Sequence, residues 1–113
     1  MNVMERLTSS VVVPVVVLER AEDALPTARA LLAGGVDTME ITFRTSCAAQ
    51  CIQAVAESCP DMLVGAGTVL NVEQAKLAVS MGAKFIVSPG FDAGVVDWCI
   101  ENGVAVTRSE ERR

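Results

Sequence analysis

The fold is decided by one stretch of the sequence, GVDTMEITFRTSCA at residues 35–48. From Thr38 to Arg44 the side chains alternate between polar and apolar, which is typical of a β-strand with two different faces. The apolar face is predicted to pack on helices, and the other face carries Glu40, Thr42 and Arg44. A carboxylate on a face that the surrounding fold would bury needs an explanation, because burying a charge without a partner is costly.

Length and composition indicate one small α/β domain. The chain has 113 residues, is 51% hydrophobic and carries a formal net charge of −5. An acidic chain is a poor match for nucleic acid, whose phosphates need a basic surface. The longest apolar run, VVVPVVVL at residues 11–18, is far short of the roughly 20 residues that span a bilayer. We interpret it as a strand and expect no membrane partner.

Four cysteines and no histidine are present, which argues against a metal site. Cys47 and Cys51 are one helical turn apart, Cys59 and Cys99 are isolated, and no C-x-x-C pair exists. We interpret the cysteines as small buried side chains of a protein in the reducing cytoplasm. A single reactive cysteine is the alternative, although no neighbouring residue would activate its thiol.

One unit repeats along the chain: an apolar strand, a loop, an amphipathic helix and a glycine. Strands are predicted at 11–17, 37–43, 62–66, 84–88 and 104–107. Helices are predicted near 23–33, 46–58, 72–81 and 92–102. Asn71 and Asp92 are expected as N-caps, and Gly34, Gly82 and Gly103 as left-handed helix stops. Strands that alternate with helices indicate βαβ units and a parallel sheet.

Two architectures fit this repeat: a doubly wound five-stranded domain and about half of a (β/α)8 barrel. A receiver-like doubly wound domain would need an aspartate after strand 3 and a lysine after strand 5, where the chain has GAGT and VTRS. In a barrel, Glu40 and Arg44 would point inward, and Thr68 would follow strand 3 at the same end. The barrel explains more of the sequence.

This constellation suits an acidic substrate. The planar guanidinium of Arg44 can bind two oxygens of a carboxylate or phosphate, and a buried Glu40 beside it could move protons. The alternative is an internal ion pair between Glu40 and Arg44 that only stabilises the structure.

Three segments resemble the bacterial 2-keto-3-deoxy-6-phosphogluconate (KDPG) and 2-keto-4-hydroxyglutarate (KHG) aldolases. They are VVPVVVLERAEDALPTARALLAGGVDTMEITFRT, VGAGTVLNVEQAKLAVSMGAKFIVSPG and NGVAVT, and the resemblance extends over residues 8–107. It implies a (β/α)8 TIM barrel, here about four and a half βα units, and a cytoplasmic class I aldolase that forms homotrimers without a metal or cofactor. Such lyases cleave a phosphorylated 2-keto-3-deoxy sugar acid, or 4-hydroxy-2-oxoglutarate, and release pyruvate.

The resemblance also implies roles for individual residues. Glu40 would transfer protons, and Arg44 and Thr68 would hold the carboxylate of the pyruvate unit. Ser88, Pro89 and Gly90 would shape the pocket after the fourth strand.

One family feature is missing, namely the lysine on the sixth strand that forms a Schiff base with the keto group. The only lysines are Lys76, predicted on a helix, and Lys84, at the start of the fourth strand. We interpret residues 1–107 as the N-terminal portion of an aldolase barrel and 108–113 as a charged tail outside the family pattern, arising from truncation, a frameshift or fragmentation. The chain alone is expected to be inactive and to self-associate. A non-catalytic half-barrel that acts by association is the alternative.

Overall fold

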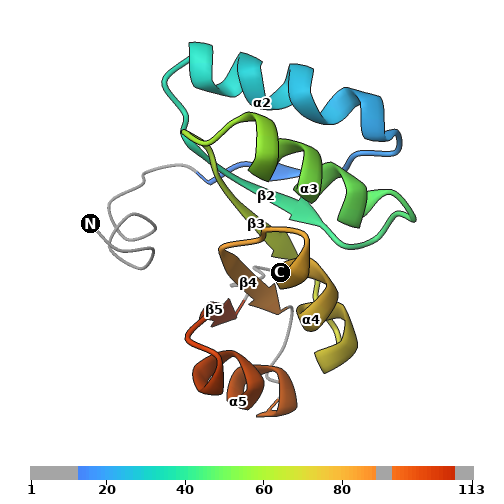
Figure 1. Cartoon of the computed structure of the whole chain (residues 1–113), viewed down its shortest axis with the longest axis vertical. Coiled ribbons are helices and arrows are strands. Elements are labelled where there is room, and N and C mark those ends of the chain that lie inside the picture. Colours follow the sequence, from blue (N-terminus) through green and yellow to red (C-terminus); the bar gives the residue numbers. More distant parts are fainter. Residues whose placement is uncertain (1–12, 89–92, 109–113) are drawn as a thin grey trace, which may run out of the picture.

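The computed structural model describes residues 13–88 and 93–108, in which strands and helices alternate along the chain (Figure 1). In order, the elements are β1 (Val15–Val16), η1 (Ala21–Asp23), α2 (Ala24–Ala33), β2 (Thr38–Thr42), α3 (Ala48–Ser58), β3 (Leu63–Gly67), α4 (Val72–Ser80), β4 (Phe85–Ser88), α5 (Ala93–Glu101) and β5 (Ala105–Arg108). Every predicted strand and helix is present. None of the helices in the described ranges has the length and apolar character needed to cross a membrane.

The first strand is much shorter than the sequence predicts. Only Val15 and Val16 are assigned to β1, against an expected strand over 11–17, of which residues 11 and 12 lie outside the described ranges. Pro14 has no N–H to donate, although its carbonyl still accepts a hydrogen bond from the Glu40 N–H at 2.9 Å. Proline therefore limits the paired part of this strand.

The cap at the start of α4 is the one that the sequence predicts. The Asn71 side chain accepts a hydrogen bond from the Gln74 N–H at 2.9 Å. The Gln74 side chain accepts from the N–H of Leu70 at 2.7 Å, one residue before the position that a regular capping box uses. The second predicted cap, Asp92, lies outside the described residues.

Left-handed glycines end three of the helices, and one of them differs from the prediction. Gly82 and Gly103 have φ of 114° and 69°, as expected. After α2 the left-handed residue is Gly35, with φ of 87°, whereas the predicted Gly34 has φ of −89°. Because Gly34 and Gly35 are adjacent, the sequence does not determine which of them takes the left-handed conformation.

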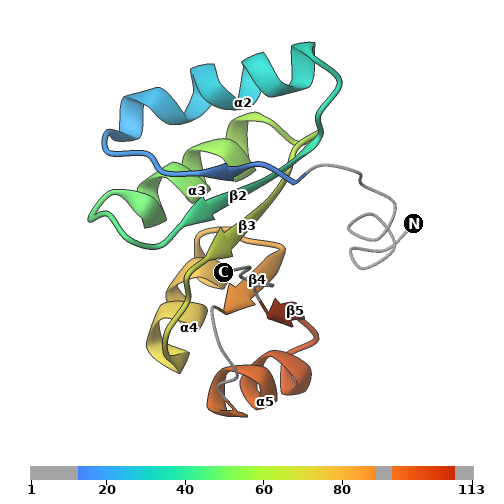
Figure 2. The same ribbon diagram turned by 180° about the vertical axis from the view of Figure 1, so that it is seen from behind.

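The order of the strands decides between the two architectures. The sheet runs β1-β2-β3-β4-β5, and every neighbouring pair is parallel. Because βαβ crossovers are right-handed, an uninterrupted order brings every helix to the same face, whereas a doubly wound sheet reverses its order. Figures 1 and 2 show α2, α3, α4 and α5 following one another round one side of the curved sheet. The domain is about half of a barrel.

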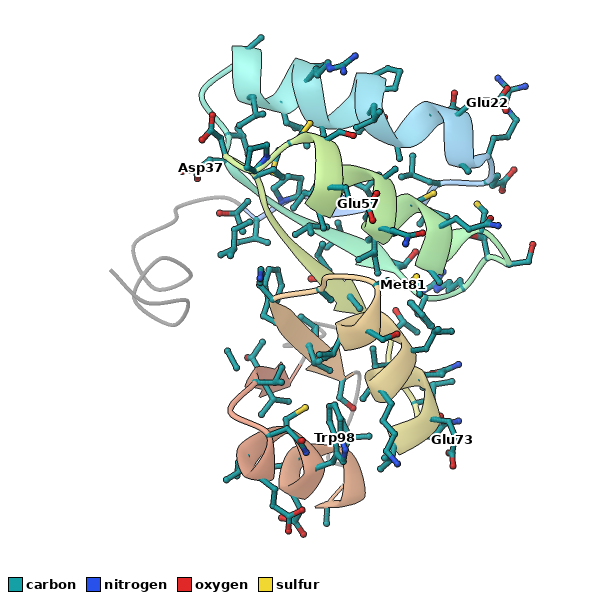
Figure 3. All side chains as sticks on the ribbon, in the orientation of Figure 1. Glu22, Asp37, Glu57, Glu73, Met81 and Trp98 are labelled. Carbon is teal, nitrogen blue, oxygen red and sulfur yellow. The ribbon has the colours of Figure 1, made fainter. Side chains whose placement is uncertain are left out.

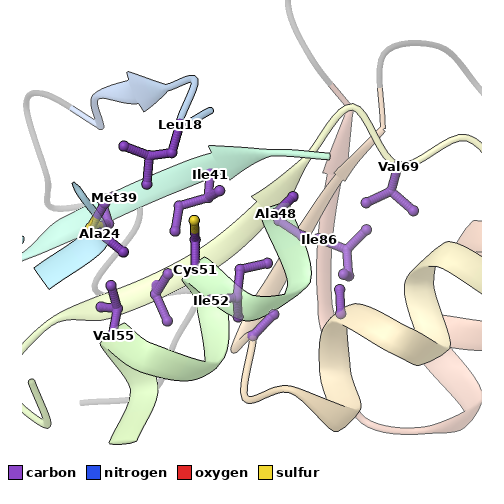
Figure 4. Close-up of a cluster of buried hydrophobic side chains, with 14 of the residues drawn as sticks. Leu18, Ala24, Met39, Ile41, Ala48, Cys51, Ile52, Val55, Val69 and Ile86 are labelled. Atoms are coloured by element: carbon purple, nitrogen blue, oxygen red, sulfur yellow. The ribbon is translucent and has the colours of Figure 1, made fainter. Parts of the chain in front are cut away.

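The main hydrophobic core lies between the sheet and these helices. From β2, Met39 and Ile41 are fully buried, and from α3 so are Ile52 and Val55 (Figure 4). This confirms that the apolar side of the opening stretch packs on helices.

A smaller cluster lies on the opposite face of the sheet, which we call the inner face. Leu63, Phe85 and Val87 form it, with Val13 and Ala105 packed alongside, so all five come from strands or from the segment leading into β1. By register and alternation Val15 and Val17 share this face, and they are 62% and 50% exposed.

Self-association is the first testable prediction. In the described sheet β1 and β5 are each paired along one side, and such edges invite pairing with another chain. We expect sedimentation to detect larger species as concentration rises, and the melting temperature to rise with them because association stabilises the folded state. The variant V15K/V17K should weaken association, because lysines protect a sheet edge.

The matched control is Ile100→Lys, which charges a residue that is 67% exposed on α5, outside the sheet. It should associate as the unmodified chain does. A monodisperse monomer with a concentration-independent melt would contradict the prediction.

Candidate functional site

Glu40 lies in the middle of β2 on the inner face. Its neighbours Met39 and Ile41 are fully buried in the helix-side core, so alternation turns Glu40 the other way. Its partners in the parallel register are Val15 on β1 and Gly65 on β3. The Glu40 side chain is half-buried. The prediction that Glu40 faces away from the helices is therefore confirmed.

The Glu40 carboxylate leans toward the carboxyl ends of the strands. It lies against Gly67, which pairs with Thr42 and is two residues beyond the register partner of Glu40. A Cβ at Gly67 would overlap Glu40 Oε2 and would lie 2.6 Å from its Cδ. Active sites of parallel barrels form at this end of the sheet.

Arg44 lies beyond the end of β2. The sequence predicts that it belongs to the strand, but the strand ends at Thr42, and Arg44 occupies a turn with an exposed side chain. The Phe43 N–H still donates to the Gly67 carbonyl at 2.7 Å, so the turn begins at the carboxyl end of the sheet. Arg44 is therefore near the end toward which Glu40 leans.

The loop that carries Arg44 is tied to the segment after β1. The Thr45 hydroxyl donates to the Leu18 carbonyl at 2.7 Å, and the Cys47 thiol donates to the same oxygen at 3.2 Å. These two side-chain contacts hold the exits of β1 and β2 together.

Thr68 follows β3 directly and has φ of 56°, in the left-handed region. Among the described residues it is the one non-glycine with positive φ. This conformation costs on the order of 1 kcal/mol and commonly marks functional positions. It turns the chain so that the Val69 N–H donates to the Val87 carbonyl at 3.1 Å. Thr68 is half-buried, at the same end of the sheet as Arg44.

Ser88 is the last residue of β4 and is 3% exposed. Alternation along β4 places Ser88 with Ile86 on the helix side, whereas Phe85 and Val87 belong to the inner face. Ser88 thus shares the carboxyl end with Thr68 but not the face of Glu40. Pro89 and Gly90 lie outside the described residues.

Arg44 and Thr68 lie at the carboxyl end of the sheet, and the carboxylate of Glu40 leans toward that end. A carboxylate can exchange protons with a bound substrate, and an exposed guanidinium can hold an anion. In the described part of the chain, no group of three or more His, Cys, Asp or Glu side chains could hold a metal ion.

The four cysteines are free thiols and all are buried. The sulfurs of Cys47 and Cys51 are 3.8 Å apart. Burial, with a smaller contribution from neighbouring Cys47, raises the pKa of the Cys51 thiol to about 12, and burial also raises the pKa of Cys99. Since only a thiolate is a good nucleophile, Cys51 and Cys99 are unsuited to catalysis near neutral pH.

Sequence reasoning missed the part that Gly65 and Gly67 play. The segment GAGT is a close-packed strand end, and the side chains packed there were not predictable from the sequence. In the structure the ring of Phe85 covers Gly65 and the carboxylate of Glu40 covers Gly67. The available signal was two glycines on one face of a strand, next to a strand with an inward carboxylate.

The chain matches the family model described as KDPG and KHG aldolase over residues 3–108. The 2-dehydro-3-deoxy-phosphogluconate aldolase of Treponema pallidum is 53% identical over 105 residues, which are 93% of this chain and 50% of that protein. The KHG/KDPG aldolase of Escherichia coli K12 is 50% identical over 84 residues, covering 74% of this chain and 39% of that one.

Solved structures agree with these matches. The 2-keto-3-deoxy-6-phospho-gluconate aldolase of Zymomonas mobilis ATCC 29191 superposes with a TM-score of 0.89 at 34% identity, covering all of this chain and 54% of that one. The KDPG aldolase of Legionella pneumophila, solved with pyruvate captured as a covalent carbinolamine intermediate, gives a TM-score of 0.81 at 36% identity, over 85% of this chain and 47% of that one. The chain spans about half the length of these relatives, or less.

Alkaline destabilisation by Cys51 is the second prediction. An unfolded thiol ionises near pH 9, whereas the folded thiol keeps its proton up to about pH 12. Above pH 9 the unfolded state therefore binds fewer protons, so the free energy of unfolding falls as pH rises, by about 1 kcal/mol at pH 10. Urea unfolding between pH 8 and pH 10 should show a larger loss in the unmodified chain than in Cys51→Ala, in which the buried thiol of Cys99 still contributes.

The matched control is Val55→Ala, which removes a similar apolar volume one turn further along α3 but no thiol. It should be less stable at every pH and keep the slope of the unmodified chain. Equal slopes for Cys51→Ala and the unmodified chain would contradict the prediction.

Proposed function

The chain belongs to the KDPG and KHG aldolase family, and from this we propose that it forms part of a class I aldolase. One proposed substrate is 2-keto-3-deoxy-6-phosphogluconate, which would be cleaved to pyruvate and glyceraldehyde 3-phosphate. The other is 4-hydroxy-2-oxoglutarate, which would be cleaved to pyruvate and glyoxylate. The enzyme would act on one of them or on both. The observation that carries the proposal is the half-buried carboxylate of Glu40 on the inner face, leaning toward the carboxyl ends of the strands.

Glu40 is assigned the proton transfers. Aldol cleavage needs a base to take the proton from the substrate hydroxyl while the neighbouring carbon–carbon bond breaks, and an acid to return a proton to the pyruvate fragment. A single carboxylate that faces the substrate can do both in turn. Its position on a strand, rather than in a loop, keeps the carboxylate in one place between these steps.

Arg44 and Thr68 are assigned to the substrate carboxylate. A guanidinium binds two carboxylate oxygens at once, and a hydroxyl can donate a further hydrogen bond. Support comes from their positions within two residues of the ends of β2 and β3, two neighbouring strands, and from the left-handed backbone of Thr68. Ser88, Pro89 and Gly90 are proposed to shape the pocket after β4 from the carboxyl end of the sheet, with the Ser88 side chain itself on the helix side.

The amine that a class I aldolase needs is proposed to lie outside this chain's sequence. Lys76 is exposed on α4. Lys84 is also exposed and immediately precedes β4, so it lies at the amino end of the sheet, opposite Thr68. Neither lysine is positioned beside Glu40 in the way that Schiff-base formation would require, and we propose that the chain alone is inactive. Assembly into trimers and a cytoplasmic location remain predictions.

Borohydride trapping is the third prediction. The chain is incubated with pyruvate and borohydride, which reduces any imine to a stable amine, and the products are analysed by peptide mass spectrometry. We expect no pyruvyl adduct above the background of an exposed lysine, since neither Lys76 nor Lys84 has the desolvated surroundings that activate an amine. The Lys76→Arg and Lys84→Arg variants calibrate that background. Stoichiometric labelling of either lysine would show that the active site has been misassigned.

A completed barrel tests Glu40 directly and is the fourth prediction. Residues 1–107 are joined to the second half of the Treponema pallidum aldolase, which should restore cleavage if the proposed function is right. In that chimera Glu40→Gln should lower turnover by about 10²–10⁴-fold while borohydride still traps pyruvate, because the amide cannot transfer protons.

Control variants of the chimera are Glu57→Gln and Glu73→Gln. Both carboxylates are exposed on helices, on α3 and α4 (Figure 3), and both variants should stay fully active. Full activity of the Glu40→Gln chimera would remove Glu40 from the mechanism. An inactive but well-folded chimera would favour the non-catalytic alternative.

A further inference from the structure

We propose that Gly67 is a positioning residue for Glu40: the missing side chain at Gly67 sets where the Glu40 carboxylate lies. The inference rests on the role proposed for Glu40, because it states that a residue of β3 positions the proton-transfer group of β2.

Space, and not backbone freedom, explains why residue 67 is glycine. The glycines with positive φ in the described ranges are Gly35, Gly82 and Gly103, so Gly67 has a backbone that other residues can adopt. Glycine inside a strand is otherwise unfavourable, since it adds conformational entropy to the unfolded chain and packs nothing. A compensating reason is needed, and the Glu40 carboxylate supplies it.

Gly67 lies close to three consecutive atoms of the Glu40 side chain, namely Cγ, Cδ and Oε2. A Cβ at Gly67 would overlap Oε2 and would lie 2.6 Å from Cδ and 2.7 Å from Cγ. Real Cβ atoms do not approach other atoms so closely, so any side chain at this position must move the carboxylate.

The Gly67 backbone cannot easily give way instead. Gly67 is buried, pairs with Thr42 in the parallel register, and its carbonyl accepts the Phe43 N–H at 2.7 Å. The next residue, Thr68, is held in the left-handed conformation. Since the backbone is fixed on both sides, a new side chain would displace Glu40. Misplacement of a catalytic group by about 1 Å can cost 10²-fold in rate.

Gly65 provides the matched comparison. It lies two residues earlier on the same strand and face, and a Cβ there would meet the Phe85 ring, whose Cδ2 is 2.5 Å away. Alanine at either position disturbs a close contact. Only alanine at 67 disturbs a carboxylate.

The first measurement is an NMR titration of the Glu40 side-chain carboxyl in this chain, with Gly67→Ala and Gly65→Ala compared. We expect Gly67→Ala to move the midpoint by about half a pH unit or more, because the carboxylate changes surroundings. Gly65→Ala should leave it within about 0.2 units. An unchanged midpoint in Gly67→Ala, or an equal change in both variants, overturns the proposal.

The second measurement is a double-mutant cycle by thermal unfolding, which also serves if Gly67→Ala alone does not fold. In a Glu40→Ala background the carboxylate is gone, so Gly67→Ala should lose at least half of its effect on the melting temperature, or should recover a folded state. The effect of Gly65→Ala should be the same in both backgrounds. Independent effects of the Glu40 and Gly67 substitutions overturn the proposal.

Both measurements are made without substrate, so their outcomes test the positioning of Glu40 independently of its proposed catalytic role. Coupling between Gly67 and Glu40 in a chain whose completed barrel tolerates Glu40→Gln would leave the positioning intact and remove the catalytic role. Loss of turnover in Glu40→Gln without coupling to Gly67 would overturn the positioning alone. In an active chimera, Gly67→Ala should lower kcat with KM little changed.

Discussion

Every crossover in the described chain passes on the same side of the sheet, and the rest of the structure depends on this constraint. The uninterrupted strand order β1 to β5 sends all the helices to one face. The other face must then be filled by side chains of strands alone, such as Leu63, Phe85 and Val87. A carboxylate can lie on that face because none of the helices in the described ranges covers it. The direction of winding thus separates a face built for stability from a face available for chemistry.

The sequence predicted well where local pattern and tertiary environment agree. Alternation in β2 was sufficient to assign Met39 and Ile41 to the core and Glu40 to the opposite face, and Asn71 was recognisable as a cap. Predictions were wrong where a boundary depends on one residue's backbone. Pro14 shortens β1, Gly35 replaces Gly34 as the helix stop, and Arg44 lies just past its strand.

The contact across strands that places the Glu40 carboxylate could not be predicted, although the end of the sheet at which Arg44 and Thr68 lie could. Register decides that Glu40 is beside Gly65, yet its side chain reaches Gly67, and neither fact follows from residue types. Family resemblance supplied roles for Glu40, Arg44 and Thr68 but no distances. The relatives are about twice as long as this chain, so the geometry seen in this chain covers about half of the length of such a protein.

The Leu18 carbonyl has a consequence for how the protein can evolve. This one oxygen accepts from both Thr45 and Cys47, and so it ties the exit of β1 to the loop after β2. With β1 reduced to two residues, this link adds to the strand pairing and to the burial of Leu18 in holding the segment after Pro14. Substitutions among the exposed valines would be tolerated as long as the acceptor stays in place, because a main-chain oxygen survives any change of side chain. Substitution at position 45 or 47 would remove a donor to this oxygen, although neither residue belongs to the strand that it holds.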